Sequence, residues 1–292
     1  AKFYRQALAE APGNHRLWVN YGDVHWLQGD VAESLVAFRR ACSLSPDAVL
    51  AWRGLAHALR DGRQYRAALE ALSKARALQD SALLAWSASQ LLLGLERYGE
   101  AYALAERRLN HPELELYRTP QPPPVLLREA SPASASAAEL VVFSEQGFGD
   151  TIQFCRYIPS LYNCADKIIF ECQPALKDLM NSLDENIVIR SPKDPIVEAD
   201  YHIPLLSLPM INDTKLETIP SAVPYLRSDQ DLAQIWQNKF DEQRPKVGLV
   251  WSGNSKRQDD WMRSCPAEFL HTILDVEGCH FVSLQKEGVP QS

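Results

Sequence analysis

The sequence predicts an array of helical hairpins, followed by a parallel α/β domain and the beginning of a second one. Tryptophan recurs at a fixed spacing in the first hundred residues, at Trp18, Trp52 and Trp86. From about residue 139, short β-rich runs alternate with helical stretches, which is typical of a parallel sheet covered on both faces. Residues 111–138 contain six prolines and a Ser/Ala-rich run, and we interpret them as a linker.

Composition and charge exclude several classes of protein. The 292 residues are 46% apolar and 23% charged, which is typical of a soluble chain that holds two domains without disulfides or metals. Residues 1–110 contain 14 Lys and Arg against 11 Asp and Glu, whereas residues 111–292 contain 16 against 26. An acidic C-terminal part without a basic stripe argues against nucleic acid as a partner. No apolar run approaches the roughly 18 residues of a membrane span, no signal peptide opens the chain, and the six cysteines form no CxxC pair, so we expect free buried thiols in the cytoplasm.

The tryptophans belong to a 34-residue repeat. The first unit reads Trp18, Tyr21, Gly22, His25, Ser34, Phe38, Ala41 and Pro46, and the second reads Trp52, Leu55, Ala56, Leu59, Ala68, Leu72 and Ala75. These rows fit the tetratricopeptide repeat (TPR) pattern, in which small residues allow two helices to cross closely. We predict a TPR α-solenoid over 1–110 with about three hairpins, and a third unit that loses one residue in its first helix. The first hairpin should be incomplete, because the start of the chain matches the second helix of a unit, and Trp18 and Trp52 should lie in equivalent, largely buried sites.

The α/β part divides at about residue 245. We expect strands over 139–144, 167–172, 187–190 and 200–204 with helices over 151–162 and 174–183, so that 139–244 form the first domain. A helix over 229–240 closes this part. A strand over 246–251, a helix over 266–276 and a strand over 280–284 then begin a second domain, which 245–292 leave incomplete.

Two loops are candidate binding sites. The first joins a strand to a helix and contains Gln146, Gly147, Gly149, Asp150 and Thr151. Its glycines allow a tight turn and close approach of a ligand to the backbone, and a helix N-terminus offers free N–H groups to an anion or a hydroxyl. Two alternatives stay open: the glycines serve the turn alone, or Asp150 is only an N-cap.

The second loop follows the strand over 246–251, where open α/β sheets bind ligands. It contains Ser252, Gly253, Asn254, Arg257, Arg263 and Ser264. The two arginines, beside a helix start capped by Ser264, suit a pyrophosphate; the alternative is a solvated loop with a serine cap. No metal-ligand spacing and no GxSxG motif is present.

Six segments, in this order, carry a family resemblance: 145–159, 171–177, 202–209, 219–226, 247–254 and 281–286. Together they resemble bacterial TPR-containing glycosyltransferases of the heptosyltransferase-like group (glycosyltransferase family 9) and, more distantly, O-linked GlcNAc transferases. The resemblance implies a GT-B enzyme, in which two Rossmann-like domains bring an acceptor and a nucleotide-sugar donor together without a metal or other cofactor. It also implies that Asp150 is the catalytic base, and that the second loop begins the donor site.

The sequence departs from these families at several positions. Relatives often have a histidine and an asparagine where this chain has Arg257 and Asp259, and the later donor-binding element is absent because the chain ends first. The asparagine ladder of the O-GlcNAc transferase groove is also missing. Its positions are Asn20, Gly54 and Ala88, then Asp23, His57 and Leu91.

The leading hypothesis is therefore a fragment, truncated at both ends, of a TPR-containing glycosyltransferase. Its partners would be a nucleotide-sugar donor of unidentified nucleotide, a protein or glycan acceptor, and a protein bound through the TPR groove. We expect the chain alone to be inactive and to bind a nucleotide-sugar at best in the millimolar range, about −4 kcal/mol. The alternative is a non-catalytic protein-interaction scaffold with a degenerate α/β domain, and a third possibility is a structural assembly protein.

Overall fold

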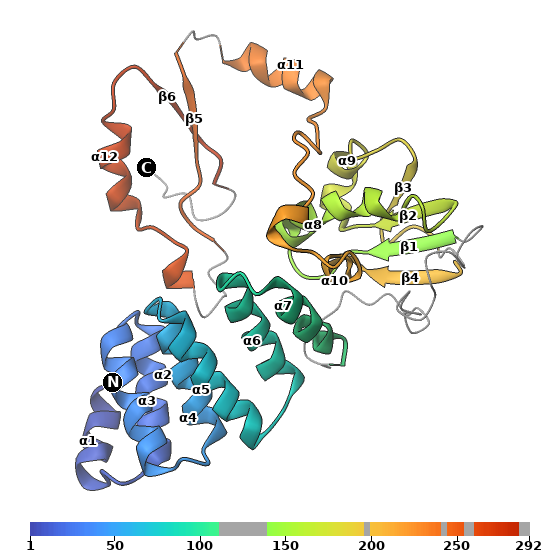
Figure 1. The fold of residues 1–292 in the computed structure, drawn as a ribbon. Helices are drawn as coiled ribbons and strands as arrows, with labels where there is room; N and C mark the ends of the chain where they lie inside the picture. The colour runs from blue at the N-terminus through green and yellow to red at the C-terminus, as the bar shows by residue number, and fades with distance from the viewer. Residues whose placement is uncertain (111–138, 196–198, 241–243, 254–259, 286–292) are drawn as a thin grey trace. The chain divides into compact units, whose positions relative to one another are not determined.

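The computed structural model describes residues 1–110, 139–195, 199–240, 244–253 and 260–285 (Figure 1). These residues divide into two compact units, Ala1–Gln79 with Trp236–Ser292, and Asp80–Ile235. The predicted boundaries at 110, 138 and 244 differ from this division, because the third helical pair falls in the unit that contains the main sheet. The predicted linker lies outside the described residues.

The N-terminal region is a series of helical pairs that follows the predicted repeat. A single helix, α1 (Lys2–Glu10), precedes the pairs. The pairs are α2 (His15–Leu27) with α3 (Val31–Leu44), α4 (Val49–Asp61) with α5 (Tyr65–Leu78), and α6 (Ala82–Gly94) with α7 (Tyr98–Ala105). A 3₁₀ helix, η1 (Glu106–Asn110), continues α7. Part of the fold-class prediction is thus confirmed: a helical, TPR-like region precedes a small parallel sheet.

The turn between the two helices has the same backbone conformation in all three pairs. Gly29, Arg63 and Glu96 all have positive φ angles, of 78°, 59° and 60°. Their spacing is 34 and then 33 residues, and α6 ends 33 residues after α4. The third unit has thus lost one residue, but not in its first helix, as predicted, because α4 and α6 are both 13 residues long. The residue is lost in the loop before α6, which spans 79–81, whereas the loop before α4 spans 45–48. The turn therefore depends on a backbone conformation that a non-glycine residue also adopts in two of the three repeats.

Trp18 and Trp52 occupy equivalent sites, as predicted. The indole Nε1 of Trp18 donates to the carbonyl of Pro12 at 2.8 Å, and that of Trp52 donates to the carbonyl of Pro46 at 2.8 Å. Both side chains are only half-buried, whereas the sequence predicted largely buried sites. The indole is partly exposed because its polar edge reaches the carbonyl of the preceding loop rather than the interior.

Phe38 fixes the distance between neighbouring pairs. Its ring, on α3, is 1% exposed and packs between Gly22 of α2 and Gly54 of α4. A Cβ atom at Gly54 would lie 2.2 Å from the ring, and one at Gly22 would lie 2.9 Å from it. The small residues of the repeat are therefore needed where the aromatic ring meets the first helix of its own pair and of the next.

The main sheet has four parallel strands in the order β3-β2-β1-β4 (Figure 1, green to yellow). The strands are β1 (Glu139–Phe143), β2 (Lys167–Glu171), β3 (Ile187–Arg190) and β4 (Tyr201–Pro204). Val141 pairs with Ile169 on one side and His202 on the other. Because the two central strands are buried on both faces, the middle of each strand is a continuous apolar run, Leu140–Val142 in β1 and Ile168–Phe170 in β2.

Short helices pack on one face of this sheet. They are α8 (Phe148–Phe154), η3 (Cys155–Leu161), η4 (Pro174–Leu176), α9 (Lys177–Met180), η5 (Leu205–Ser207) and α10 (Leu208–Ile211). Their apolar side chains form one core with Leu140, Val142 and Phe170. The predicted helix over 151–162 is α-helical only in its first part, because Pro159 provides no N–H group and the chain continues as a 3₁₀ helix. The predicted helix over 174–183 is likewise a 3₁₀ turn followed by one α-turn.

The C-terminal part contains a two-stranded parallel sheet of β5 (Lys246–Leu249) and β6 (His280–Ser283), with little core. Its helical elements are α11 (Gln230–Lys239), η7 (Asp260–Met262), η8 (Ala267–Leu270) and α12 (His271–Leu274). None of the described residues from 221 to 285 is buried. The predicted elements are therefore present, but the helix over 266–276 is reduced to short turns.

The six cysteines are free thiols, as predicted, but only half of them are buried. Cys42, Cys155 and Cys172 are buried, whereas Cys265 is exposed. Burial raises the pKa of the Cys172 thiol to about 11. This thiol is therefore protonated and unreactive at neutral pH.

We predict that Gly54→Ala will lower the free energy of unfolding of the helical unit by about 1–3 kcal/mol, because the new methyl group overlaps the buried Phe38 ring. Gly99→Ala is the matched control, since a Cβ at this helical position meets nothing within 4 Å. Denaturant unfolding followed by circular dichroism measures both variants. Equal effects of the two substitutions would contradict the packing, and Phe38→Leu should recover part of the loss caused by Gly54→Ala.

Candidate functional site

The loop between β1 and α8 places Asp150 in the first turn of a helix that follows a central strand. Gly147 is the N-cap residue of α8, and Asp150 is the third residue inside the helix. The backbone N–H of Gly147 donates to Asp150 Oδ2 at 3.1 Å. The alternative that Asp150 is only an N-cap is therefore wrong, although its carboxylate does accept the N–H of the N-cap residue. Its Oδ1 atom has no hydrogen-bond partner among the described residues.

The tight turn of this loop is made by Gln146 rather than by the glycines. Gln146 has a φ of 62°, whereas Gly147 is extended, with φ of −85° and ψ of 172°. The prediction that the glycines make the turn is thus wrong. A Cβ at Gly149 would meet nothing within 4 Å, so the space beside this residue is open. The second predicted role of the glycines, room for a ligand close to the backbone, remains a proposal.

Thr151 holds the loop from inside the domain. Its side chain is fully buried, and its hydroxyl donates to Gln173 Oε1 at 2.9 Å. The side-chain amide of Gln173 donates in turn to the carbonyl of Gln146 at 3.3 Å. Gln173 follows β2 and was not among the predicted site residues, although it lies in one of the segments that carry the resemblance. Thr151 and Gln173 therefore fix the loop rather than face a ligand.

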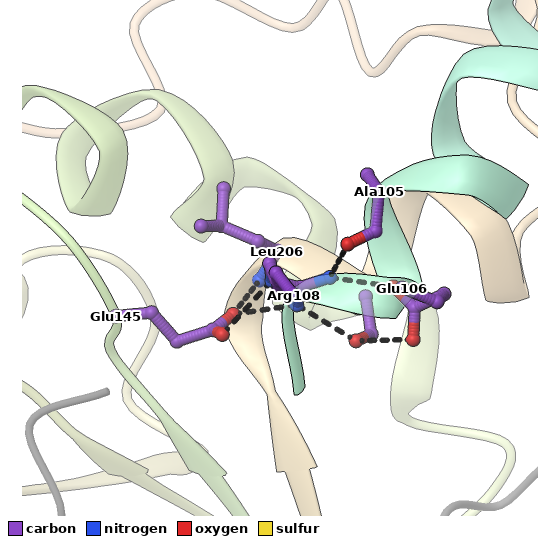
Figure 2. A network of polar contacts seen from close by, with 6 residues as sticks. Ala105, Glu106, Arg108, Glu145 and Leu206 are labelled. Carbon is purple, nitrogen blue, oxygen red and sulfur yellow. Dashed lines mark hydrogen bonds and ion pairs between the residues drawn. The ribbon is translucent and has the colours of Figure 1, made fainter. Parts of the chain in front are cut away.

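A buried charge network lies directly before this loop (Figure 2). Glu145 and Arg108 are both fully buried, and the guanidinium donates from Nε to Oε1 at 3.0 Å and from Nη2 to Oε2 at 2.7 Å. Burial raises the pKa of the Glu145 carboxyl, although Arg108 offsets part of this effect. Burial opposes the charge of Arg108, but Glu145 and Glu106 outweigh it and raise the pKa of the guanidinium. No motif revealed this pair, because its members are 37 residues apart on either side of the proline-rich segment.

The second candidate loop lies in the other compact unit. The Ser264 hydroxyl donates to Asp260 Oδ1 at 2.8 Å and accepts from the backbone N–H of Gly253 at 3.0 Å. Ser264 is therefore not a helix cap, since the N-cap of η8 is Pro266. The Arg263 side chain is exposed and has no ion-pair partner in the part of the chain that the structure describes. Asn254 and Arg257 lie outside the described residues.

Ser252 is fixed by a residue that the sequence analysis missed. The side chain of Gln285, just after β6, donates to Ser252 Oγ at 2.9 Å and accepts from the Ser252 N–H at 3.1 Å. This contact joins the loops that follow the carboxyl ends of β5 and β6. Gln285 also lies in a segment that carries the resemblance.

The first helices of the first two repeats share a polar face around one tryptophan. The indole N–H of Trp26 donates to Asp61 Oδ2 at 2.6 Å, and the ring lies 6.1 Å from that of His57. Burial, with Arg60 and Arg53 nearby, lowers the pKa of His57 to about 4. Gly54 and Ala88, at two of the asparagine-ladder positions, are buried packing positions, whereas Asn20 is exposed. This face therefore carries charges and an aromatic ring in place of an asparagine ladder.

Within the described ranges, no group of three or more His, Cys, Asp and Glu residues is arranged to hold a metal ion. None of the helices seen there has the length and apolarity needed to cross a membrane.

Comparison with known proteins supports the helical part of this description. Residues 15–58 match the family model described as a tetratricopeptide repeat. Protein FlbA of Caulobacter vibrioides is 24% identical over 306 residues and matches 96% of the chain. The chain spans half the length of this relative.

Several solved structures also resemble part of the chain. The crystal structure of MamA has a TM-score of 0.35 and 19% identity, with 36% of this chain and 61% of that chain covered. YrrB, described as a TPR protein with an unusual peptide-binding site, has a TM-score of 0.36 and 19% identity, with 38% and 58% covered. Pseudomonas aeruginosa pilF has a TM-score of 0.33 and 25% identity, with 35% and 49% covered.

The low pKa of His57 gives a prediction about acid stability. Folding disfavours the charged imidazole, so the contribution of His57 is complete above its unfolded pKa of about 6.5 and is lost as the pH falls towards 4. The unfolding free energy of the protein with His57 should therefore fall by up to about 3 kcal/mol between pH 7 and pH 4, and in His57→Gln this part of the pH dependence should be absent. Denaturant unfolding at the two pH values measures this change. His15→Gln is the control, and an unchanged pH dependence in His57→Gln would contradict the assignment.

Proposed function

We propose that the protein is a binding scaffold whose TPR helices recognise a polypeptide segment. The observation that carries this proposal is the face shared by α2 and α4, in a region that matches the TPR family. Trp26 and His57 form an aromatic floor, and Arg53 and Asp23 provide charges of both signs. Arrays of this kind present extended surfaces of their first helices to a partner.

Arg53 is suited to contact a partner directly. Its guanidinium lies near enough to Asp23 and His57 to exert a lowering effect on the pKa of each. The described residues form no salt bridge between Asp23, which is exposed, and Arg53, so the guanidinium can bind a ligand carboxylate at little cost in stability. An arginine next to an aromatic floor is a common anchor in protein interfaces.

We predict that Arg53→Ala will weaken binding to peptides selected on a random peptide array by at least about tenfold, which corresponds to about 1.4 kcal/mol. Arg66→Ala is the matched control, because Arg66 is exposed on the second helix of the same pair. Fluorescence anisotropy with each selected peptide measures the affinities. Failure to select any peptide, or an equal loss in both variants, would contradict the proposed surface.

A second candidate function is transfer of a sugar from a nucleotide-sugar to an acceptor hydroxyl. The observation that favours it is the position of Asp150 after a central parallel strand, with Oδ1 unpaired and open space beside Gly149. In this proposal Asp150 accepts the proton of the acceptor hydroxyl, whose oxygen bonds to the anomeric carbon while the nucleoside diphosphate leaves. Arg263, with Ser252, Gly253, Asn254, Arg257 and Ser264, would belong to the phosphate site, and Gln146, Gly147 and Thr151 to the loop of the base.

We predict that Asp150→Asn in the full-length protein will lower the turnover of a nucleotide-sugar by at least about 100-fold, because the amide cannot accept the proton. Asp166→Asn is the control, since Asp166 is exposed before β2. Nucleoside diphosphate release from UDP-, ADP- and GDP-sugars provides the measurement. Unchanged turnover in Asp150→Asn would exclude this residue as the base.

A further inference from the structure

The Glu145 carboxylate is the last side chain before the Gln146–Asp150 loop, and both of its oxygens are engaged. Besides the two bonds from Arg108, Oε2 accepts the backbone N–H of Leu206 at 3.1 Å. Leu206 follows β4, which lies beside β1 in the sheet. Glu145 therefore joins the carboxyl ends of two neighbouring strands to a guanidinium that comes from outside the sheet (Figure 2).

Arg108 is equally saturated, since all five of its N–H donors are used. Two go to Glu145, and the Nη1 atom donates to Glu106 Oε1 at 2.8 Å and to the carbonyl of Ala105 at 3.2 Å. The fifth, from Nη2, goes to Ser207 Oγ at 3.0 Å, and this hydroxyl donates to Glu106 Oε2 at 2.9 Å. The end of α7 and the start of η1 are thus fixed to the sheet by directional bonds.

A buried network of this kind contributes little to the free energy of folding, but it fixes the positions of the groups that it joins. Two carboxylates and one guanidinium are removed from water, and well-packed apolar residues of similar volume are often at least as stable. The residue that follows, Gln146, has the positive φ of the turn and is held on its other side by Gln173. A non-glycine residue keeps this strained backbone conformation only where the surrounding contacts hold it.

We propose that Arg108 is a positioning residue for the Gln146–Asp150 loop. The last helical turn of the repeats sets the loop conformation through Glu145, so that the third helical pair and the candidate site move as one body. The functional meaning of this loop rests on the second proposed function, whereas the mechanical role of Arg108 does not. The structure thereby links the end of the TPR region to the loop that would hold the base.

The test compares hydrogen exchange in the loop with hydrogen exchange in the strands. In the complete chain, Arg108→Met with Glu145→Gln removes the Arg108–Glu145 ion pair without leaving Glu145 charged and unpaired. Glu106, the second carboxylate that pairs with Arg108, keeps the hydrogen bond from the Ser207 hydroxyl. The Gly147 and Thr151 amides, which donate to Asp150 and to the carbonyl of Gly147, report on the loop, and the amides of β2 and β3 report on the strands. Lys177→Met, which removes a partly exposed ion pair with Asp194 outside these strands, is the control.

We expect the double variant to exchange at Gly147 and Thr151 at least tenfold faster, with the exchange of β2 and β3 changed less than twofold. Unchanged loop exchange, or an equal increase in loop and strands, would overturn the proposal. Arg108→Lys keeps the charge but not the paired bonds, and the same loop-specific increase must appear in it if the double variant does not fold. Activity loss in Asp150→Asn tests the second function separately, so the two failures are distinguishable.

Discussion

The fully buried guanidinium of Arg108 is the constraint on which the α/β unit depends. It is satisfied only if η1, the end of β1 and the residues after β4 are all in place, because each of these supplies an acceptor. A misplaced neighbour would leave a charge buried without a partner, and that costs far more than the pair contributes. The network therefore selects one arrangement of these elements. It also explains why Glu145, directly before an open loop, is inaccessible to solvent.

The Arg108 network explains why the third helical pair belongs to the unit of the sheet. The sequence period suggests that the third helical pair is another repeat, and its helices do follow the repeat closely. Its contacts nevertheless place it in the unit of the sheet, since α6 and α7 lie within Asp80–Ile235. The first two pairs, held together by Phe38 between two glycines, provide the face that we propose for polypeptide recognition. In these two proposals, one kind of repeat serves two purposes, recognition in α2–α5 and support of a loop in α6–α7.

Features that depend on contacts within one repeat or one strand–helix unit were predictable from the sequence, whereas features that depend on residues far apart in the sequence were not. The 34-residue repeat predicted the helical pairs and the equivalence of the Trp18 and Trp52 sites, because each repeat makes the same local contacts. Alternation of strands and helices predicted the parallel sheet, but the helices are shorter than expected, since Pro159 and the core allow only brief turns. In the candidate site, the sequence placed Asp150 in the loop between the first strand of the α/β domain and the following helix. It did not indicate that Gln146 makes the turn or that Arg108 reaches Glu145, because neither depends on residue type and spacing alone.

The Arg108 network makes the third helical pair and the sheet one cooperative unit. Native-state hydrogen exchange, measured residue by residue at increasing denaturant concentration, gives the opening free energy of each element and therefore shows whether they open together. We expect α6 and α7 to share one opening free energy with β1 and β2, and α2–α5 to have a different one. Exchange of α6 and α7 together with α2–α5, at a free energy distinct from that of the sheet, would show that the third helical pair is not part of the sheet unit.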